Sequence, residues 1–240
     1  MRIALIGYGK MGHEIEQIAL SRQHSISFKI TQHNKEDLTR IHPDNTDVAI
    51  EFTQPEAAYE HLRYCLENHI PVVSGTTGWL AHKAAIEELC TAKKGSFFYA
   101  SNFSIGVNLF FQVNEYLAQL MAKYEEYNVH IEEVHHTEKK DAPSGTAITL
   151  AEGILKHYPK KQQWVNKATT AKEELGILSQ RLPEVPGTHS IHYQSTIDDI
   201  TIERIAHSRR GFALGAVIAA EFTSKHPGIW GMKDLLQLDA

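Results

Sequence analysis

The first hundred residues alternate short apolar runs with amphipathic stretches, and this alternation restricts the fold more than any other feature of the chain. The apolar runs predict buried strands at residues 3–6, 26–30, 47–52, 70–74 and 96–100. Helical spacing of apolar residues predicts helices at residues 11–21, from a cap at Thr53 to residue 68, and at residues 80–93. Strands that alternate with helices through short loops are typical of a parallel sheet covered on both faces. We therefore expect a Rossmann-type α/β domain.

The pattern changes after residue 102. Helices are predicted at residues 105–124, 144–158 and 212–223, and strands at residues 129–134, 189–197 and 200–205. Residues 159–187, which contain three prolines, are expected to form an irregular connection. We therefore expect a second, α+β domain at residues 104–211, and residues 212–240 are expected to return to the first domain at residues 1–103.

Composition excludes several classes of protein. The 240 residues carry 24 basic and 29 acidic side chains, so a net charge of −5 gives no general attraction for nucleic acid or an anionic membrane. No apolar run approaches the ~20 residues of a membrane span, and the run at residues 3–6 is too short for a signal peptide. Cys65 and Cys90 lack metal-type spacing and are expected to be reduced. We expect a cytoplasmic protein whose anionic ligands are held by local clusters.

A glycine-rich turn, Gly-Tyr-Gly-Lys-Met-Gly at residues 7–12, lies between the first expected strand and the first expected helix. In a dinucleotide site Gly7 permits the tight turn, Gly9 lets the backbone approach the pyrophosphate, and Gly12 lets the helix pack on the sheet. Amides at the helix N-terminus, at Lys10 and Met11, would then face the phosphates. The alternative is a tight turn that binds nothing, but the position between strand and helix favours the dinucleotide.

Cofactor preference depends on the residues after the second expected strand. An acidic residue there would bind the adenosine ribose, but none follows directly, and the nearest are Glu36 and Asp37. Lys29 and Lys35 lie close by and would meet a 2′-phosphate. The sequence therefore favours NADPH, or the use of both NADPH and NADH.

Two further loops follow expected strands of the same sheet, at residues 75–78 and 101–104. Ligands of open parallel sheets gather at the carboxyl ends of the strands. The first loop would place Gly75, Thr76 and Thr77 beside the nicotinamide ribose. The second loop would lie at the border of the same crevice with its residues Ser101, Asn102 and Phe103. Ordinary loop chemistry and a helix cap explain each loop equally well when it is taken alone.

Residues 133–147, Glu-Val-His-His-Thr-Glu-Lys-Lys-Asp-Ala-Pro-Ser-Gly-Thr-Ala, join an expected strand to an expected helix. His135 and His136 are adjacent at the strand end, so their side chains point to opposite faces and both cannot easily bind one metal ion. The sequence therefore predicts no metal site. One histidine facing a cleft would donate a proton near neutral pH, and the other would position a substrate. A pair of surface histidines is the alternative.

The same segment supplies a cation and hydroxyl groups. Either Lys139 or Lys140 would reach back toward the cleft, although lysines are usually solvated surface charges. Backbone amides at a helix N-terminus suit a carboxylate, and the next expected helix opens with Ser144, Gly145 and Thr146. A plain helix cap is the alternative. We interpret the whole segment as a site for a small anionic substrate that must be protonated.

Residues 133–147 resemble the signature of the bacterial 4-hydroxy-tetrahydrodipicolinate reductases (dihydrodipicolinate reductases) of lysine and diaminopimelate biosynthesis. The glycine turn, residues 75–78 and residues 101–108 resemble further motifs in the family's order, so the resemblance covers nearly the whole chain. It implies a dinucleotide-binding domain, here residues 1–103 with 212–240, and a substrate-binding and oligomerisation domain, here residues 104–211. It also implies reduction of a small dicarboxylate by NADPH or NADH, usually by a homotetramer.

The resemblance also implies roles for individual residues. His135 resembles the family's general acid and His136 a substrate contact, while Lys139, rather than Lys140, occupies the family's lysine position. The cradle for a substrate carboxylate corresponds to Ser144, Gly145 and Thr146. Family cofactor contacts correspond to Gly75, Thr77 and Phe103. The glycine turn is one residue shorter than in many members, which bears on cofactor preference but not on the reaction.

Two other functions would also explain the glycine turn. A dehydrogenase of the homoserine or sugar type shares the turn, but it does not account for Pro-Ser-Gly-Thr beside a histidine pair. A non-catalytic NAD(P) sensor needs no cluster of acid and cation. We therefore expect a reductase that receives hydride from the nicotinamide and a proton from His135.

Overall fold

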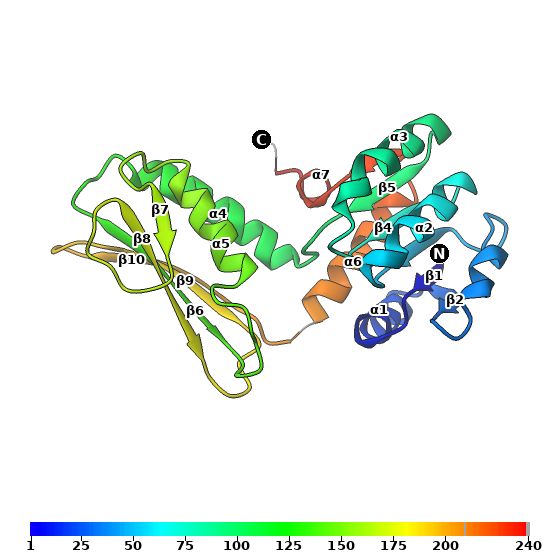
Figure 1. Ribbon diagram of the computed structural model, residues 1–240, viewed down its shortest axis with the longest axis horizontal. Coiled ribbons are helices and arrows are strands. Elements are labelled where there is room, and N and C mark those ends of the chain that lie inside the picture. The colour runs from blue at the N-terminus through cyan, green and yellow to red at the C-terminus, as the bar shows by residue number, and fades with distance from the viewer. Residues whose placement is uncertain (209, 239–240) are drawn as a thin grey trace. The chain divides into compact units, whose positions relative to one another are not determined.

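The computed structural model, which describes residues 1–208 and 210–238, divides the chain into two units (Figure 1). The first contains Met1–Ile105 with Arg210–Ala240, and the second contains Gly106–Arg209. The chain therefore leaves the first unit once and returns to it once, because the second unit is one continuous insertion.

A six-stranded parallel sheet forms the first unit, in the order β11-β5-β4-β3-β1-β2. Its strands are β1 (Arg2–Ile6), β2 (Ser25–Ile30), β3 (Val48–Glu51), β4 (Val72–Ser74), β5 (Ser96–Tyr99) and β11 (Gly228–Trp230). Its helices are α1 (Lys10–Ser21), α2 (Pro55–Glu67), α3 (Lys83–Lys93), α6 (Arg210–Thr223) and α7 (Met232–Leu236), with short 3-10 helices η1 (Lys35–Arg40) and η2 (Leu80–His82). The prediction of a Rossmann-type parallel sheet is confirmed.

Alternation along each strand distributes apolar side chains to two cores. Ile3 and Leu5 of β1 pack toward α1 and α6, whereas Ala4 and Ile6 pack toward α2 and α3. All four are at most 1% exposed. Burying one such aliphatic side chain contributes about 1.5–3 kcal/mol. A strand that is covered on both faces reads as a continuous apolar run, which is why the sequence identified these strands.

One detail of this unit differs from the sequence-based expectation. Thr53 does not cap α2, because the helix begins one residue later and its N-cap is Gln54, which makes no side-chain cap bond. Pro55 takes the first helical position, where its missing N–H costs nothing. The Thr53 hydroxyl donates instead to the Glu51 carboxylate at the end of β3. The Thr53 side chain therefore bonds the buried Glu51 carboxylate and is not available to cap the helix.

The second unit is a mixed five-stranded sheet with two helices on one face (Figure 1). The strand order is β10-β9-β6-β8-β7. The elements are α4 (Ile105–Met121), β6 (Asn128–His135), α5 (Gly145–Leu155), β7 (Gln163–Val165), β8 (Glu174–Arg181), β9 (Thr188–Gln194) and β10 (Asp199–Ile205). The expected antiparallel pairing of β9 with β10 is present.

The prediction of an irregular connection at residues 159–187 was wrong. The segment contains β7 and β8, and β8 pairs in parallel with both β6 and β7. A glycine in the middle of β8 weakened the strand signal. Its absence of a side chain is required there, because a Cβ on Gly176 would lie 2.9 Å from the Lys167 carbonyl oxygen.

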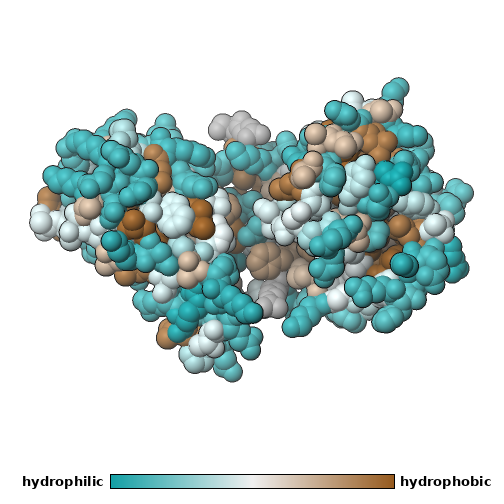
Figure 2. Space-filling view, viewed as in Figure 1, coloured by the Kyte–Doolittle hydropathy of each residue, from teal (hydrophilic) through white to brown (hydrophobic). Residues whose placement is uncertain are grey.

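Hydrophilic residues cover most of the face of each unit that Figure 2 shows, with hydrophobic residues scattered among them. Exposed apolar side chains of this scattered kind are normal for a folded domain. Among the residues described by the structure, no helix combines the length and the apolar character needed to cross a bilayer.

Candidate active site

The turn between β1 and α1 has the geometry of a nucleotide-binding loop. Gly7 has a φ of +96°, and a Cβ there would lie 1.9 Å from the Phe52 carbonyl oxygen. A Cβ on Gly12 would lie 2.5 Å from the Gly7 carbonyl oxygen, so only glycine allows this approach of helix to turn. At Gly9, by contrast, an added Cβ would meet no atom within 4 Å. Open space at the N-terminus of α1 is where a pyrophosphate would bind.

Two clefts open on this turn, at the carboxyl ends of the strands. One, of about 500 Å³, is lined by Gly9, Lys10, Met11, Gly12, Phe52, Thr53, Gln54, Pro55, Gly75, Thr76 and Thr77. The structure therefore brings together two loops that the sequence analysis singled out separately. The other, of about 690 Å³, is lined by Gly7, Tyr8, Gly9, residues 30–33, Lys35, Phe52, Thr53, Gln54, Ala57 and His61. Phe52, Thr53 and Gln54 form a wall common to both, and together the clefts suit the two halves of a dinucleotide.

The loop at residues 101–104 is placed differently from the other two. Ser101 is exposed and Asn102 is half-buried, and neither lines the two clefts. The Asn102 side-chain oxygen accepts a bond from the Ser104 amide at 2.9 Å. Phe103 is a core residue that is 2% exposed, and its ring centre lies 5.6 Å from that of Phe52. Phe103 therefore supports the cleft wall from behind.

The two lysines considered for a 2′-phosphate have different surroundings. Lys29 is paired with Glu16 at 2.7 Å and donates to the Tyr8 hydroxyl at 3.2 Å. Hydrogen bonds from Lys29 and Tyr8 lower the pKa of Glu16, which keeps that pair charged. Lys35, the first residue of η1, lines the second cleft. Of the two, Lys35 is therefore better placed to meet a phosphate.

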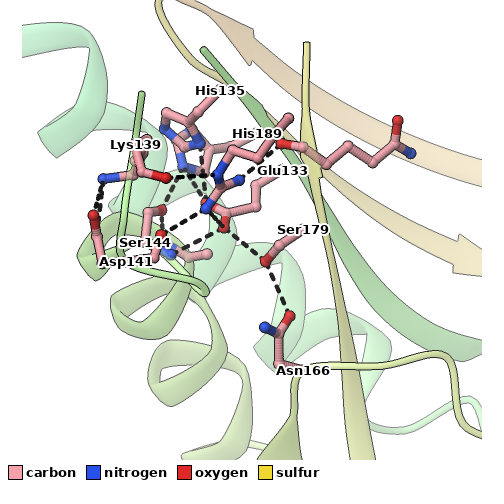
Figure 3. A network of polar contacts seen from close by, with 11 residues as sticks. Glu133, His135, Lys139, Asp141, Ser144, Asn166, Ser179 and His189 are labelled. Carbon is pink, nitrogen blue, oxygen red and sulfur yellow. Dashed lines mark hydrogen bonds and ion pairs between the residues drawn. The ribbon is translucent and has the colours of Figure 1, made fainter. Parts of the chain in front are cut away.

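Glu133 is the centre of a buried polar network in the second unit (Figure 3). Its Oε1 accepts hydrogen bonds from the Ser144 amide at 3.0 Å and from the Ser179 hydroxyl at 2.7 Å. Its Oε2 lies 3.3 Å from Nδ1 of His135 and 3.6 Å from Nε2 of His189. Burial raises the pKa of Glu133, but the two imidazoles and the two serines outweigh this and hold that pKa far below its usual range. Glu133 is therefore an anion.

His135, not His136, faces this anion. Residues 133 and 135 of β6 share one face of the sheet, and His135 is only 7% exposed. Nδ1 of His135 is the ring nitrogen beside Glu133, so a proton transfer from this imidazole would use Nε2. Gly187 leaves room at that atom, since a Cβ there would lie 3.1 Å from Nε2. His136 lies just past the strand and is half-buried.

His189 is a member of the network that the sequence analysis missed. It stands opposite Glu133 in the β6–β9 pairing, and Ser179 stands opposite Glu133 in the β6–β8 pairing. Burial lowers the pKa of His189, which keeps its imidazole neutral near neutral pH. Its Nε2 lies 3.1 Å from the Ser144 hydroxyl. Strand register, which the local sequence does not display, brings these side chains together.

The N-terminus of α5 is held by the same network. Ser144 is the N-cap, and its hydroxyl accepts a bond from the Ala147 amide at 3.2 Å. An added Cβ on Gly145 would meet nothing within 4 Å, so the first turn of the helix faces open space. Thr146 follows in the first turn and is half-buried. The positive end of a helix dipole next to open space suits a carboxylate.

Lys139 and Lys140 are clearly distinguished by the structure. The Lys139 ammonium lies 2.8 Å from both carboxylate oxygens of Asp141, whereas Lys140 is exposed. Arg181, at the end of β8, donates to the backbone carbonyls of Lys139 at 3.3 Å and of Asp141 at 2.6 Å. The loop that carries Lys139 is thus tied to the strand beside Glu133.

Three side chains of the network also have the spacing of metal ligands. Each side chain offers one ligand atom, and these three atoms lie within 4.8 Å of one another; the residues are Glu133, His135 and His189. The set contains only one of the two adjacent histidines, as the alternation of a strand requires. Its ionised carboxylate accepts bonds from Ser144 and Ser179, and the Arg181 guanidinium lies 3.7 Å from its Oε1, so protein groups surround the anion.

The first unit is of the Rossmann type, and its clefts fit a dinucleotide. The second is an α+β unit with a buried network of an acid and histidines. This combination is the architecture of a nicotinamide-dependent oxidoreductase with a separate substrate domain.

More specifically, the chain belongs to the dihydrodipicolinate reductase family. Models of the N-terminus and the C-terminus of dihydrodipicolinate reductase match residues 1–103 and 106–236. The chain is 48% identical over 241 residues to a 4-hydroxy-tetrahydrodipicolinate reductase of Christiangramia forsetii, and the alignment covers 98% of each protein.

Solved structures share the fold. A dipicolinate-bound dihydrodipicolinate reductase from Paenisporosarcina sp. TG-14 superposes with a TM-score of 0.75 at 24% identity, over 98% of each chain. A probable dehydrogenase from Thermotoga maritima gives a TM-score of 0.56 at 12% identity, over 99% of this chain and 93% of that one. The family and the two-part α/β architecture inferred from the sequence are confirmed.

Proposed function

We propose that this protein reduces 4-hydroxy-tetrahydrodipicolinate to tetrahydrodipicolinate with NADPH or NADH, in lysine and diaminopimelate biosynthesis. The observation that carries the proposal is the ionised Glu133 beside Nδ1 of His135, in a chain that is 48% identical to a reductase of that name. A buried anion at one ring nitrogen stabilises the protonated imidazole and directs its other N–H outward.

In the proposed reaction, the substrate loses its 4-hydroxyl as water and the bound nicotinamide supplies hydride to a ring carbon of the cyclic imine. Negative charge then develops on the enamine side of the ring, and Nε2 of His135 supplies the proton that neutralises it. Glu133 offsets the positive charge that His135 carries before the transfer. His136 contacts the substrate beside this acid.

The dicarboxylate is held by two groups in the proposal. The first is the N-terminus of α5, formed by Ser144, Gly145 and Thr146, whose dipole attracts a carboxylate. The second is Lys139, which the Asp141 carboxylate and the Arg181-bound backbone hold in place. The dipicolinate found in the Paenisporosarcina enzyme is a planar dicarboxylate of the same class as this substrate.

The cofactor is proposed to occupy the two clefts of the first unit. Its pyrophosphate would lie on the amides of Gly9, Lys10, Met11 and Gly12, and its nicotinamide ribose beside Gly75, Thr76 and Thr77. Ser101 and Asn102 are proposed to border the cofactor from outside these clefts, and Phe103 to support its binding through Phe52. With Lys35 and no acidic residue directly after β2, NADPH is favoured or both cofactors are used. The ratio of kcat/KM for NADPH to that for NADH tests this, and a strong preference for NADH would contradict it.

The wider assignments are part of the same proposal. Residues 1–103 with 212–240 bind the dinucleotide, and residues 104–211 bind substrate and mediate assembly of a homotetramer. The enzyme is proposed to be cytoplasmic, to bind neither nucleic acid nor membrane, and to need no metal. Size-exclusion chromatography with light scattering tests the oligomer, and full activity after treatment with a chelator tests the absence of a metal.

A coupled assay tests the central reaction. Dihydrodipicolinate synthase supplies the substrate, and oxidation of NADPH or NADH is followed by absorbance. Consumption of the reduced cofactor that depends on the synthase product is the expected result. A protein that binds the cofactor but oxidises none in the presence of the product would be a sensor or a different dehydrogenase, and the proposal would fail.

A further inference from the structure

Glu51, the last residue of β3, is a fully buried carboxylate beneath the wall shared by the two cofactor clefts. Its side chain is 0% exposed. Oε2 accepts a hydrogen bond from the Ser74 hydroxyl at 2.7 Å, and Oε1 accepts from the Thr76 hydroxyl at 2.8 Å. Oε1 also accepts from the Thr53 amide at 3.0 Å and from the Thr53 hydroxyl.

This carboxylate is stabilised by hydroxyl and amide donors rather than by a strong cation. The charged or titratable group nearest to it among the described ion pairs is His61, whose Nδ1 lies 4.0 Å away. Burial raises the pKa of Glu51, but bonds from His61, Thr53, Ser74 and Thr76 outweigh it and lower the pKa overall. Burying a charge without a paired cation is costly, so a position that keeps one calls for a reason other than stability.

The direction in which the neighbouring hydroxyl groups donate their protons supplies that reason. Each hydroxyl has one proton, and those of Ser74, Thr76 and Thr53 are directed to Glu51. The Thr76 oxygen also accepts a bond from the Thr53 amide at 2.8 Å, so it is nearly saturated. Nδ1 of His61 lies 3.4 Å from the oxygen of Thr53, which is half-buried, so at least one of the two lone pairs on that oxygen stays unused. Thr53 lines both clefts and therefore presents an acceptor to them.

We propose that Glu51 is a positioning residue for the cofactor: it fixes the Thr53 hydroxyl as a hydrogen-bond acceptor, which binds a donor group of the dinucleotide. Donors on a dinucleotide are the ribose hydroxyls, the carboxamide N–H₂ and the adenine N–H₂, whereas its phosphates only accept. A wall that offers an acceptor therefore selects the ribose, carboxamide or adenine parts, and the amides of the glycine turn select the phosphates. This rests on the proposed function only in taking the ligand to be a nicotinamide dinucleotide.

Equilibrium binding of NADPH and NADH to the full-length protein, followed by nucleotide fluorescence, tests the inference. Glu51→Gln can no longer take protons from all its donors, so the affinity is expected to fall roughly tenfold. Ser74→Ala is the matched control, because it removes one bond to the same carboxylate but does not line either cleft. It is expected to lower the melting temperature and leave the affinity unchanged.

A double-mutant cycle separates positioning from a general loss of structure. Thr53→Val keeps the shape of the side chain and removes the acceptor, so it should weaken binding by about the same factor as Glu51→Gln. If Glu51 acts through Thr53, the double variant binds no worse than either single variant. Thr53→Ser, which restores the hydroxyl, is expected to recover most of the lost affinity.

Three results would overturn the inference. The first is a fully additive cycle, and the second is a Glu51→Gln protein that binds the cofactor like the wild type. The third, which is informative even if Glu51→Gln fails to fold, is unchanged cofactor affinity in Thr53→Val. Because binding is measured without turnover, a protein that binds as described but lacks reductase activity would contradict the proposed reaction and leave the role of Glu51 standing.

Discussion

Glu133 and His135 lie two residues apart on one face of β6, with Oε2 of the acid 3.3 Å from Nδ1 of the imidazole. The carboxylate is fixed from its other side by the Ser144 amide and the Ser179 hydroxyl. Its position therefore does not depend on a ligand. The network links His135, the proposed proton donor, to the N-terminus of α5. One buried anion, Glu133, therefore orients both the His135 imidazole and the proposed carboxylate site.

Stability is expected to decrease on acidification, because two buried groups of this network take up protons more readily in the unfolded chain. The pKa of Glu133 is depressed by folding, so its contribution is present above the usual pKa of a glutamate and is lost as the pH falls below it. Folding also depresses the pKa of His189, so stability begins to fall below the usual pKa of histidine, near 6.5.

Urea unfolding across this pH range provides the measurement. The free energy of unfolding of the wild type should fall steadily as the pH drops from 7 through the histidine range and then through the carboxylate range. Glu133→Gln should cost about 3 kcal/mol at neutral pH and flatten the lower part of the curve. Parallel pH profiles for the wild type and the variant would show that Glu133 is not held as an anion.

Lys139 and Lys140 form a natural matched pair for testing the substrate contact. Lys139→Ala should lower kcat/KM by at least about tenfold, because it removes a cation that Asp141 and Arg181 hold in place. Lys140→Ala should change it by less than about twofold, since this side chain is exposed. Steady-state kinetics with varied substrate distinguish the two, and equal effects would remove Lys139 from the site.

Substitution by alanine is expected to destabilise the protein at Gly7 but not at Gly9. Gly7→Ala places a Cβ 1.9 Å from a carbonyl oxygen at a φ of +96°, so it should destabilise the first unit by about 3 kcal/mol or more. Gly9→Ala meets no protein atom within 4 Å and has an extended backbone, so the melting temperature should hardly change.

Gly9→Ala is expected to weaken cofactor binding even though it leaves the stability of the protein almost unchanged. The methyl group of Gly9→Ala would occupy the space proposed for the pyrophosphate and should weaken NADPH binding by about tenfold or more. Thermal unfolding and cofactor titration of both variants provide the check. A Gly9→Ala protein with wild-type affinity would show that the dinucleotide does not approach this turn.

The sequence was sufficient for the parallel sheet because its strands are buried on both faces, which makes each a contiguous apolar run such as Ile3–Ile6. It was insufficient for β8, where Gly176 and polar residues interrupt the pattern of a strand that lies between β6 and β7 in the second sheet. The difference is physical: a run shows local burial, whereas membership of a mixed sheet depends on partners far away in the chain.

The same distinction applies to the site. His135, Lys139 and Ser144 lie within one short segment, so a candidate site could be proposed from the local sequence. Glu133 was in that segment but had no inferred role, and His189 lies on another strand. Only the register that sets Glu133 opposite His189 reveals the network, and local sequence patterns do not encode register.

Turnover of His135→Gln in the coupled assay, measured with cofactor affinity on the same sample, tests the central claim most directly. Glutamine fills a similar space but cannot deliver a proton, so kcat should fall by about 10²–10⁴-fold while NADPH binds as in the wild type. Near-normal turnover in this variant, with the cofactor bound normally, would contradict the assignment of His135 as the proton donor.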